Sequence, residues 1–412
     1  MNILNDEERL LLKLLEQALF GRENEIDKEA LKETRLEILQ EEAKMNAVFS
    51  LIYPILQSKG FSTVNYDNLF FQRLANNIRV AHEHSELHHM FLSNDISYVI
   101  LKGCASAMYY SEPLLRSMGD VDFLVPESEL KKVDCLLKKV KFEALEGDMH
   151  EYHTTYQRKQ NGMCSVWETH WSPSGIPQGK VGEKVKKYLE NVIDTANPCT
   201  IQGVDCLVPS SFHHGLIMLL HTATHLINAG VGLRHLCDWA VFVDAFSDEE
   251  FKMMFEKKLK DIGMWKFAQI LTQLCIKYLG VSNKEWCSVS GEEYLERLMC
   301  DICKGGNFGV KDKNRINQAK LLTNSKTASV EERNLLVQFV ETMNERTRFF
   351  LPITKRMPVL LPIGWLYVGG RHLARIKKGI RPKINVNHMI KGAAERREIY
   401  KEFQLFAEEK GD

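Results

Sequence analysis

The spacing of hydrophobic residues predicts helices over most of this chain. Leucines recur at helical spacing from Leu10 to Leu15, and a second helical pattern runs from residue 29 to residue 56. A third pattern predicts a helix from Asp67, as its N-cap, to about Leu92. Its buried stripe would be Phe71, Leu74, Ile78 and Ala81, and its polar face would carry His82, His84, His88 and His89.

Strand spacing replaces helical spacing between residues 96 and 171. The apolar run from Tyr98 to Leu101 has the length and β-branched character of a strand, which Lys102-Gly103 ends. A second run, residues 120–125, carries two acids, Asp120 and Asp122, which share a face because alternate side chains of a strand point the same way. A helix from Pro126 and a strand near residues 142–145 follow.

Two alternating runs, around residues 152–157 and 163–171, flank Asn161-Gly162 and predict a β-hairpin. On its second strand, Val166, Glu168 and His170 share one face. Two interpretations stay open: an exposed strand face, or an acid and a histidine that join Asp120 and Asp122 in one site.

Residues 176–345 have mostly helical patterns. Pro209 and Ser210 begin a helix to about Ile227. One stripe of this helix, which is either solvated or lines a cleft, is formed by His214, Met218, His221 and His225. In the next helix Arg234 and Asp238, four residues apart, form either a helix-surface pair or part of a site. Residues 305–309 are glycine-rich and predict a turn rather than a phosphate loop.

The tail combines an apolar run, residues 357–368, with a basic stretch that includes Arg371, Arg375 and Arg381. It either docks on the helical domain or makes weak contact with an anionic membrane surface. The patterns together predict an α+β protein of four parts. These are an N-terminal helical segment (1–66), a small mixed-sheet α/β domain (67–175), a larger helical domain (176–345) and an apolar and basic tail (346–412).

Composition adds few constraints. Lys and Arg together number 54, as do Asp and Glu, so net charge gives no strong signal for a nucleic-acid partner. The ten scattered cysteines, the lack of a recognisable signal peptide and the lack of a long apolar run predict a cytoplasmic protein. Cys300 and Cys303 form a Cys-x-x-Cys without a second pair, which does not by itself predict a zinc site.

The two acids of the 120–125 run carry the chemical prediction. They lie about 7 Å apart along a strand, and their repulsion in an apolar frame requires a compensating charge. Mg²⁺ supplies such a charge and binds one or two carboxylates together with substrate phosphates. Glu168 adds a third acid, and three acids suit a two-metal site. The alternative is two incidental acids at a solvated strand end.

Several motifs occur in an order that resembles a known group of enzymes. They are Lys102-Gly103, Arg116-x-x-Gly119-Asp120-Val121-Asp122, Glu168-x-His170-Trp171, His221-x-x-x-His225, Arg234…Asp238, Gly306-Asn307-Phe308-Gly309 and Leu360 to Trp365. With these motifs the chain resembles the nucleotidyltransferase superfamily that includes DNA polymerase β, and more closely a bacterial family of uncharacterised nucleotidyltransferases. The resemblance spans about residues 43 to 378.

The resemblance implies a metal-dependent transfer of NMP from an NTP to a hydroxyl acceptor, with release of pyrophosphate. The implied catalytic and metal-binding residues are Asp120, Asp122 and Glu168, with Mg²⁺ or Mn²⁺ as cofactor. The implied nucleotide-binding residues are Lys102, Gly103, Arg116 and Gly119. The implied substrate-positioning residues are His170, His221, His225, Arg234 and Asp238.

The acceptor and the preferred base stay open at this point, and so do two other functions. One is a binding or scaffold protein that keeps a nucleotidyltransferase fold without the chemistry. The other is a toxin-like transferase that modifies tRNA or protein.

Overall fold

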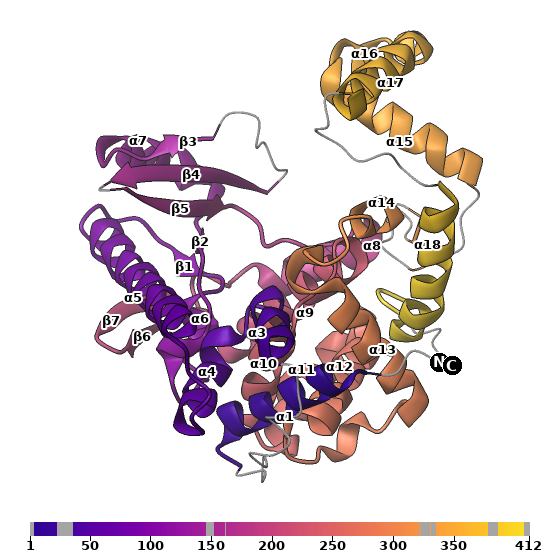
Figure 1. The fold of residues 1–412 in the computed structure, drawn as a ribbon. Helices are drawn as coiled ribbons and strands as arrows, with labels where there is room; N and C mark the ends of the chain where they lie inside the picture. The colour runs from indigo at the N-terminus through magenta and orange to yellow at the C-terminus, as the bar shows by residue number, and fades with distance from the viewer. Residues whose placement is uncertain are drawn as a thin grey trace.

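The computed structural model describes residues 4–22, 36–145, 152–160, 162–319, 321–322, 330, 335–377 and 386–407. Within these residues a small mixed sheet stands beside a larger helical body, and a helical hairpin projects from that body (Figure 1). The α+β class expected from the sequence is confirmed. Asn161 of the hairpin turn and Arg381 of the basic tail lie outside the described residues.

The sheet has the strand order β1-β2-β5-β4-β3, in which β2 and β5 run parallel and the other neighbours run antiparallel. Its strands are β1 (Val99–Ile100), β2 (Val121–Leu124), β3 (Glu143–Ala144), β4 (His153–Gln160) and β5 (Met163–His170). The predicted hairpin is confirmed as β4 and β5. The expected strand 98–101 is shorter than predicted, with only two residues in the ladder.

One long helix and a two-stranded ribbon cover one face of the sheet. Helix α5 (Val64–Leu92) packs Phe91 edge-to-face against Phe123 of β2, and Phe123 in turn packs on Trp167 of β5. A two-stranded ribbon, β6 (Asn197–Ile201) with β7 (Val204–Val208), adds Ile201, Cys206 and Val208 to this sheet core. The ribbon interrupts the region that the sequence patterns made helical. The short α7 (Leu130–Lys139) also packs here, through Val133 and Leu137.

Helix α5 departs from its sequence prediction in three ways. Its N-cap is Thr63, whose hydroxyl accepts from the amide of Tyr66; Asp67 instead accepts a 2.8 Å hydrogen bond from the Tyr53 hydroxyl. The expected stripe was right for Ala81, which is buried, but wrong for Phe71 and Ile78, which are exposed while Phe70, Asn77 and Val80 are buried. The expected histidine face was also wrong in part, because His84 is fully buried.

The helical body has one apolar core that includes both ends of the chain. The N-terminal helices α1 (Asp6–Phe20), α3 (Leu36–Met45) and α4 (Phe49–Ser58) share this core with helices from the middle of the chain. Those helices are α8 (Gly179–Leu189), α9 (Ser211–Asn228), α10 (Leu233–Asp244), α11 (Asp248–Asp261), α12 (Trp265–Leu279) and α13 (Glu292–Gly305). The helical pattern over residues 29–56 corresponds, among the described residues, to α3 and α4, which are separated where Ala47 has a φ of 58°. Residues 29–35 of that pattern lie outside the described residues. The start of α9 at the Ser210 N-cap is confirmed.

The tail divides between two places. Helix α18 (Val386–Tyr400) docks on the helical body, where buried Arg396 donates to the carbonyls of Leu226 and Ile227. Helices α15 (Leu335–Phe350), α16 (Ile353–Arg356) and α17 (Leu361–Lys377) form the projecting hairpin (Figure 1). Neither these helices nor any other within the described ranges is long and apolar enough to cross a membrane.

Candidate active site

The fold brings the three predicted acids together. Asp122 on β2 and Glu168 on β5 are direct partners in the parallel ladder, so their side chains lie side by side on one face. Asp120 precedes β2 by one residue and lies on the same face. One carboxylate oxygen from each of Asp120, Asp122 and Glu168 lies within 4.8 Å of the others. Asp122 is 3% exposed, whereas Asp120 is exposed.

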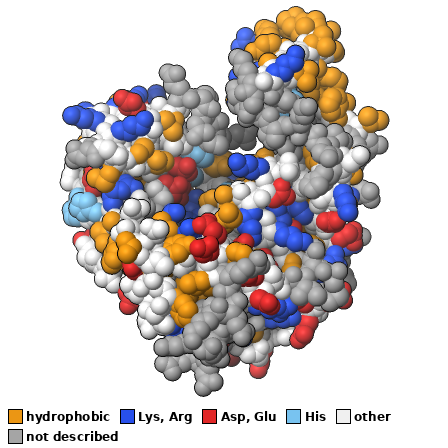
Figure 2. Space-filling model, in the orientation of Figure 1, with side chains coloured by type: hydrophobic (Ala, Val, Ile, Leu, Met, Phe, Trp, Pro, Cys, Tyr) orange, Lys and Arg blue, Asp and Glu red, His pale blue; other side chains and the backbone are white. Residues whose placement is uncertain are grey.

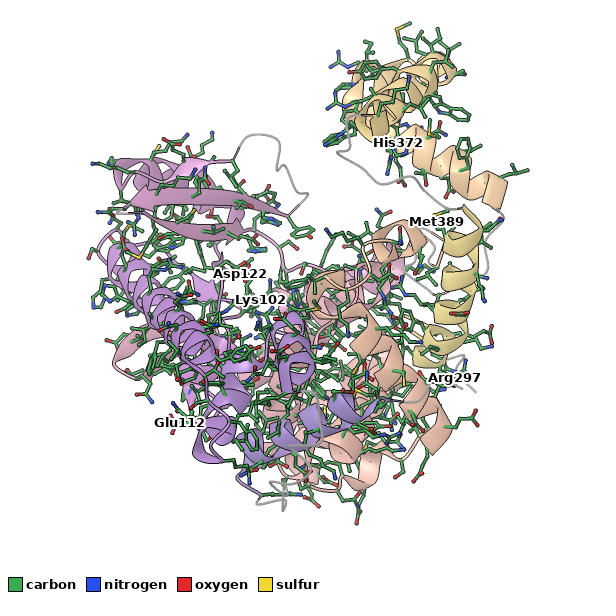
Figure 3. The ribbon with its side chains drawn as sticks, in the orientation of Figure 1. Lys102, Glu112, Asp122, Arg297, His372 and Met389 are labelled. Carbon is green, nitrogen blue, oxygen red and sulfur yellow. The ribbon has the colours of Figure 1, made fainter. Side chains whose placement is uncertain are left out.

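A lysine and a histidine surround Asp122. The Lys102 ammonium, from the turn after β1, lies 3.2 Å from Asp122 Oδ2, and Figure 3 shows the two side chains facing each other. His170 Nε2 lies 3.2 Å from Asp122 Oδ1 and 3.3 Å from Glu168 Oε2. Burial opposes ionisation of Asp122, yet its pKa is lowered because Lys102 and His170 outweigh burial. The buried carboxylate is therefore held in its charged form.

The pKa of Asp120 is shifted in the opposite direction. The negative charge of Asp122, reinforced by partial loss of water, raises the pKa of Asp120 to about 6. Two neighbouring acids with pKa values pushed apart are typical of a functional site. The cluster of three carboxylates fits one or two divalent cations, which would relieve this repulsion.

His153 is a site residue that the sequence patterns did not single out. It pairs with His170 across β4 and β5, and its Nε2 lies 3.8 Å from Glu168 Oε2. Both imidazoles are buried. The alternation that places Glu168 and His170 on one face would also have placed His153 there, had the hairpin register been known.

The turn after β1 needs glycine for a local reason. Gly103 has a φ of 60° and a ψ of −115°, and a Cβ at this position would lie 2.7 Å from His84 Nε2. Gly103 and the buried His84 therefore pack as a unit that holds Lys102 at the site. Gly119, by contrast, is exposed, and a Cβ there would meet no atom within 4 Å. The nucleotide-binding roles of both glycines stay predictions.

Arg116 and Asp238 form a buried bidentate pair that links the sheet side of the site to α10. The Arg116 guanidinium donates from Nε and Nη2 to the two Asp238 oxygens, each at 2.7 Å, and the Tyr110 hydroxyl donates to Oδ1 at 2.7 Å. The interpretation of Asp238 as half of a helix-surface pair with Arg234 was wrong. Arg234 instead donates to the Ser117 carbonyl at 3.3 Å and lies over the ring of Phe308, at 5.6 Å.

One histidine of α9, His221, lines a small cleft beside Lys102. A cavity of about 30 Å³ is bounded by Lys102, Ser106, Met218, His221, Arg234 and His235, among other residues. The solvated-stripe interpretation was therefore wrong for His214 and His221, which are buried. The rings of His221 and His225 are 4.2 Å apart, and those of His221 and His235 are 5.5 Å apart. The sequence analysis did not single out His235, because this residue directly follows Arg234 in a stretch whose pattern is that of an apolar helix.

These imidazoles are neutral at physiological pH. Burial first, and the charges of Lys102 and Arg234 next, lower the pKa of His225 to about 4. Burial and neighbouring cations likewise lower the pKa of His221 and His235. Phe308 packs against this histidine group, with its ring centroid 4.7 Å from that of His225. Its backbone has a φ of 55°. The expected turn at residues 305–309 is thus confirmed, and it places an aromatic ring at the cleft.

A buried carboxylate on α5 fixes the strand that carries Glu168. Glu83 accepts hydrogen bonds from Ser165 Oγ at 2.6 Å and from Trp167 Nε1 at 3.0 Å, and it also pairs with Arg79. These contacts lie on the face of β5 opposite the acids. They tie β5 to α5 and so set the position of Glu168. In the space-filling view, acidic, histidine and basic side chains face a hollow between the sheet and the helical body (Figure 2).

Comparison with known proteins agrees with this geometry. A family model described as "Uncharacterised nucleotidyltransferase" matches residues 33–280, which is more than half of the chain. The chain belongs to this family of uncharacterised nucleotidyltransferases. The matched range contains the three acids, Lys102 and the histidine cluster, while the projecting hairpin lies beyond it. A search of curated proteins finds no match.

Solved structures also match part of the chain. Among them is an antigenic nucleotidyltransferase-like protein from Paracoccidioides brasiliensis, with 14% sequence identity and a TM-score of 0.31. The match covers 50% of this chain and 94% of that one.

Proposed function

We propose that the protein transfers NMP from an NTP to a hydroxyl acceptor and releases pyrophosphate. One observation carries this proposal: on and beside two neighbouring strands within the range that matches the nucleotidyltransferase family, three carboxylates converge within 4.8 Å beside a lysine. A cluster so rich in negative charge fits divalent cations and the phosphates that accompany them.

Each residue of the cluster has a distinct task in this scheme. Asp120 and Asp122 would hold Mg²⁺ or Mn²⁺, and Glu168 would complete the ion on the acceptor side or act as general base. The bound ions would supply positive charge to the triphosphate and increase the acidity of the acceptor hydroxyl. Lys102, 26% exposed at its side chain, would stabilise charge on the departing pyrophosphate.

Substrate positioning falls to the residues around the cleft. His221 and Arg234 line it beside Lys102, and the His225 ring lies 4.2 Å from that of His221. The neutral imidazoles of the two histidines offer hydrogen bonds without adding charge. Arg116 and Asp238 are engaged with each other, so we assign them to positioning the segment 116–119 that leads to Asp120. His170 would orient Asp122 and Glu168.

The test is incubation of the purified protein with each α-labelled NTP, Mg²⁺ or Mn²⁺, and a cell extract fractionated into metabolites, RNA and protein. The double variant Asp120→Ala/Asp122→Ala is the control. The proposal predicts label in one fraction with the intact acids only, and that fraction identifies the acceptor class.

Other outcomes separate the other functions. Label in tRNA or protein would identify the toxin-like transferase. A protein that transfers no label and binds no NTP by calorimetry would be a scaffold that keeps the fold, and the proposal would be overturned.

A further inference from the structure

We infer that His153, Glu168 and His170 form a mixed nitrogen and oxygen metal site that prefers a transition-metal ion such as Zn²⁺ or Co²⁺ over Mg²⁺. The inference concerns the carboxylate cluster of the proposed function and deepens that function. It depends on two histidines, of which His170 also contacts Asp122 and His153 does not belong to the carboxylate cluster.

The distances carry the inference. Glu168 Oε2 lies 3.3 Å from His170 Nε2 and 3.8 Å from His153 Nε2, and one ligand atom of each residue lies within 4.8 Å of the others. A tetrahedral ion with bonds of about 2.0–2.2 Å has ligand separations of about 3.3–3.6 Å. Two of the three separations are thus close to what such an ion needs, before any side chain moves.

The positions of the histidines are fixed by the sheet. His153 and His170 are direct partners across β4 and β5, and their ring centroids are 4.8 Å apart. Both side chains are nearly inaccessible, at 6% and 2% exposure, while the Glu168 side chain is 23% exposed. A metal would therefore enter from the side of Glu168 and meet two rigid imidazoles.

Ligand chemistry sets the metal preference. Imidazole nitrogen suits Zn²⁺ and its first-row neighbours, whereas Mg²⁺ selects oxygen and keeps several waters. Glu168 belongs to both groups of ligands, because it also lies within 4.8 Å of Asp120 and Asp122. The nitrogen-containing site therefore adjoins the carboxylate site and shares one residue with it.

The test uses Co²⁺ as a spectroscopic probe and Zn²⁺ in calorimetry, on the full chain without nucleotide. We expect one Co²⁺ with visible d–d bands and no thiolate charge-transfer band, which excludes binding by exposed Cys135 or Cys164. His153→Ala should weaken Zn²⁺ binding at least tenfold. The matched control is His89→Ala, at an exposed histidine on α5, which should leave the affinity unchanged.

Two results would overturn the inference: unchanged Zn²⁺ affinity in both His153→Ala and His170→Ala, or equal affinity of the wild-type protein for Mg²⁺ and Zn²⁺. Far-ultraviolet circular dichroism checks that the variants are folded. Because the readout is metal binding, the inference can fail while nucleotidyl transfer survives, and loss of transfer alone does not affect it.

A second observation, on the projecting hairpin, carries an independent inference. We propose that α15–α17 docks on an anionic lipid surface. Of the 24 exposed large apolar side chains among the described residues, twelve lie between Leu336 and Leu373. Figure 2 shows them gathered on the outer surface of the hairpin.

The hairpin is an ordered unit rather than a loose tail. Trp365 Nε1 of α17 donates to Asn344 Oδ1 of α15 at 3.0 Å, and the Phe339 and Trp365 rings meet edge-to-face at 6.1 Å. The helices approach closely at Gly364, where a Cβ would lie 2.1 Å from Thr347 Cγ2. Packing thus uses one face of α17 and leaves the other to solvent.

The solvent face of α17 is apolar at helical spacing. Ile363, Leu366 and Leu373 lie on it, with exposures of 66%, 78% and 61%. Such a stripe on a helix too polar to span a bilayer is typical of a segment that lies in the interface.

The charge of the hairpin indicates which kind of surface it would bind. Residues 335–377 contain seven Lys or Arg and two Glu. Five of these cations line a groove of about 560 Å³ between the helices, together with Glu345: Arg346, Arg348, Lys355, Arg371 and Arg375. Basic side chains beside exposed apolar ones complement a surface that offers phosphate and hydrocarbon together, which is an anionic membrane.

The test is co-sedimentation of the full chain with vesicles of phosphatidylcholine containing phosphatidylglycerol. We expect binding that rises with phosphatidylglycerol content and falls with salt. The triple variant Ile363→Ser/Leu366→Ser/Leu373→Ser should lose most of it, whereas Met253→Ser, at an 84%-exposed methionine on α11, should not.

Three results would overturn the lipid assignment. They are no binding to any vesicle, equal binding by the triple variant, and self-association through this face, seen by sedimentation equilibrium as a dimer that the triple variant abolishes.

Discussion

At the scale of single residues, the site depends on how Asp120 and Asp122 differ. Lys102 and His170 stabilise the charge of buried Asp122, whereas the charge of Asp122 disfavours that of Asp120. Although they lie only two positions apart, the two ionised acids thus have opposite effects on the stability of the metal-free protein. Mutation of each acid can therefore distinguish its effect on stability from its role in the reaction.

The substitution Asp120→Asn should stabilise the metal-free protein at pH 8 while it abolishes transfer. The raised pKa of Asp120 means that its ionised form costs stability above about pH 6, and this cost vanishes as the pH falls toward 3.8, where both folded and unfolded states bind the proton. We expect a melting temperature about 1–2 °C higher at pH 8, with no gain near pH 4. Thermal denaturation in EDTA measures this, and a lower melting temperature at pH 8 would contradict it.

The substitution Asp122→Asn should have the opposite effect on stability. It leaves Lys102 and His170 without their anionic partner, at a cost of about 1–3 kcal/mol because Lys102 is partly exposed. Urea denaturation at pH 7 measures this loss. An unchanged midpoint would show that the Asp122 contacts do not stabilise the fold.

At the scale of elements, the turn from β1 into α6 (Cys104–Ala107) controls the position of Lys102. Its positive φ at Gly103 and the buried ring of His84 leave no room for a Cβ. The sequence predicted the break in the strand at this glycine, and it predicted the hairpin and the shared face of Glu168 and His170. It did not predict the burial of His84. A buried stripe of α5 can begin at either Phe70 or Phe71, and only tertiary packing decides which of these two helix faces is buried.

The substitution Gly103→Ala should destabilise the protein by about 2–4 kcal/mol, from the strained φ and the overlap with His84. Adding His84→Ala should restore part of this loss, because it removes the overlapping ring but not the strain. Urea denaturation of both single variants and the double variant gives the coupling energy. Strictly additive losses would contradict the packing of Gly103 against His84.

At the scale of the whole molecule, the site lies where the sheet meets the helical body, and Arg116 with Asp238 bridges the two. Sequence patterns placed both residues among site candidates but paired Asp238 with Arg234, its neighbour one turn away. Arg116 and Asp238 are 122 positions apart in the chain, and a contact at that separation does not appear in the local spacing of residues. The same limit hid the contacts of His153 with His170 and of Glu83 with Ser165 and Trp167, which join different elements.

The substitution Asp238→Asn should cost about 3–5 kcal/mol, because it leaves the Arg116 guanidinium buried without a counter-charge. Denaturation measures this cost, and Glu285→Gln, at the exposed carboxylate of η3 (Glu285–Cys287), is the control. A loss below 1 kcal/mol would show that the bridge does not hold the sheet and the helical body together.

The central claim is that the three carboxylates direct nucleotidyl rather than phosphoryl transfer. The most direct measurement compares products from α-labelled and γ-labelled NTP, with Mg²⁺ or Mn²⁺, for the wild-type protein and Asp122→Asn. The account predicts that α-label enters the acceptor, that γ-label appears only in pyrophosphate, and that the variant is at least about 100-fold slower. Transfer of γ-label to the acceptor, or an undiminished rate for Asp122→Asn, would contradict it.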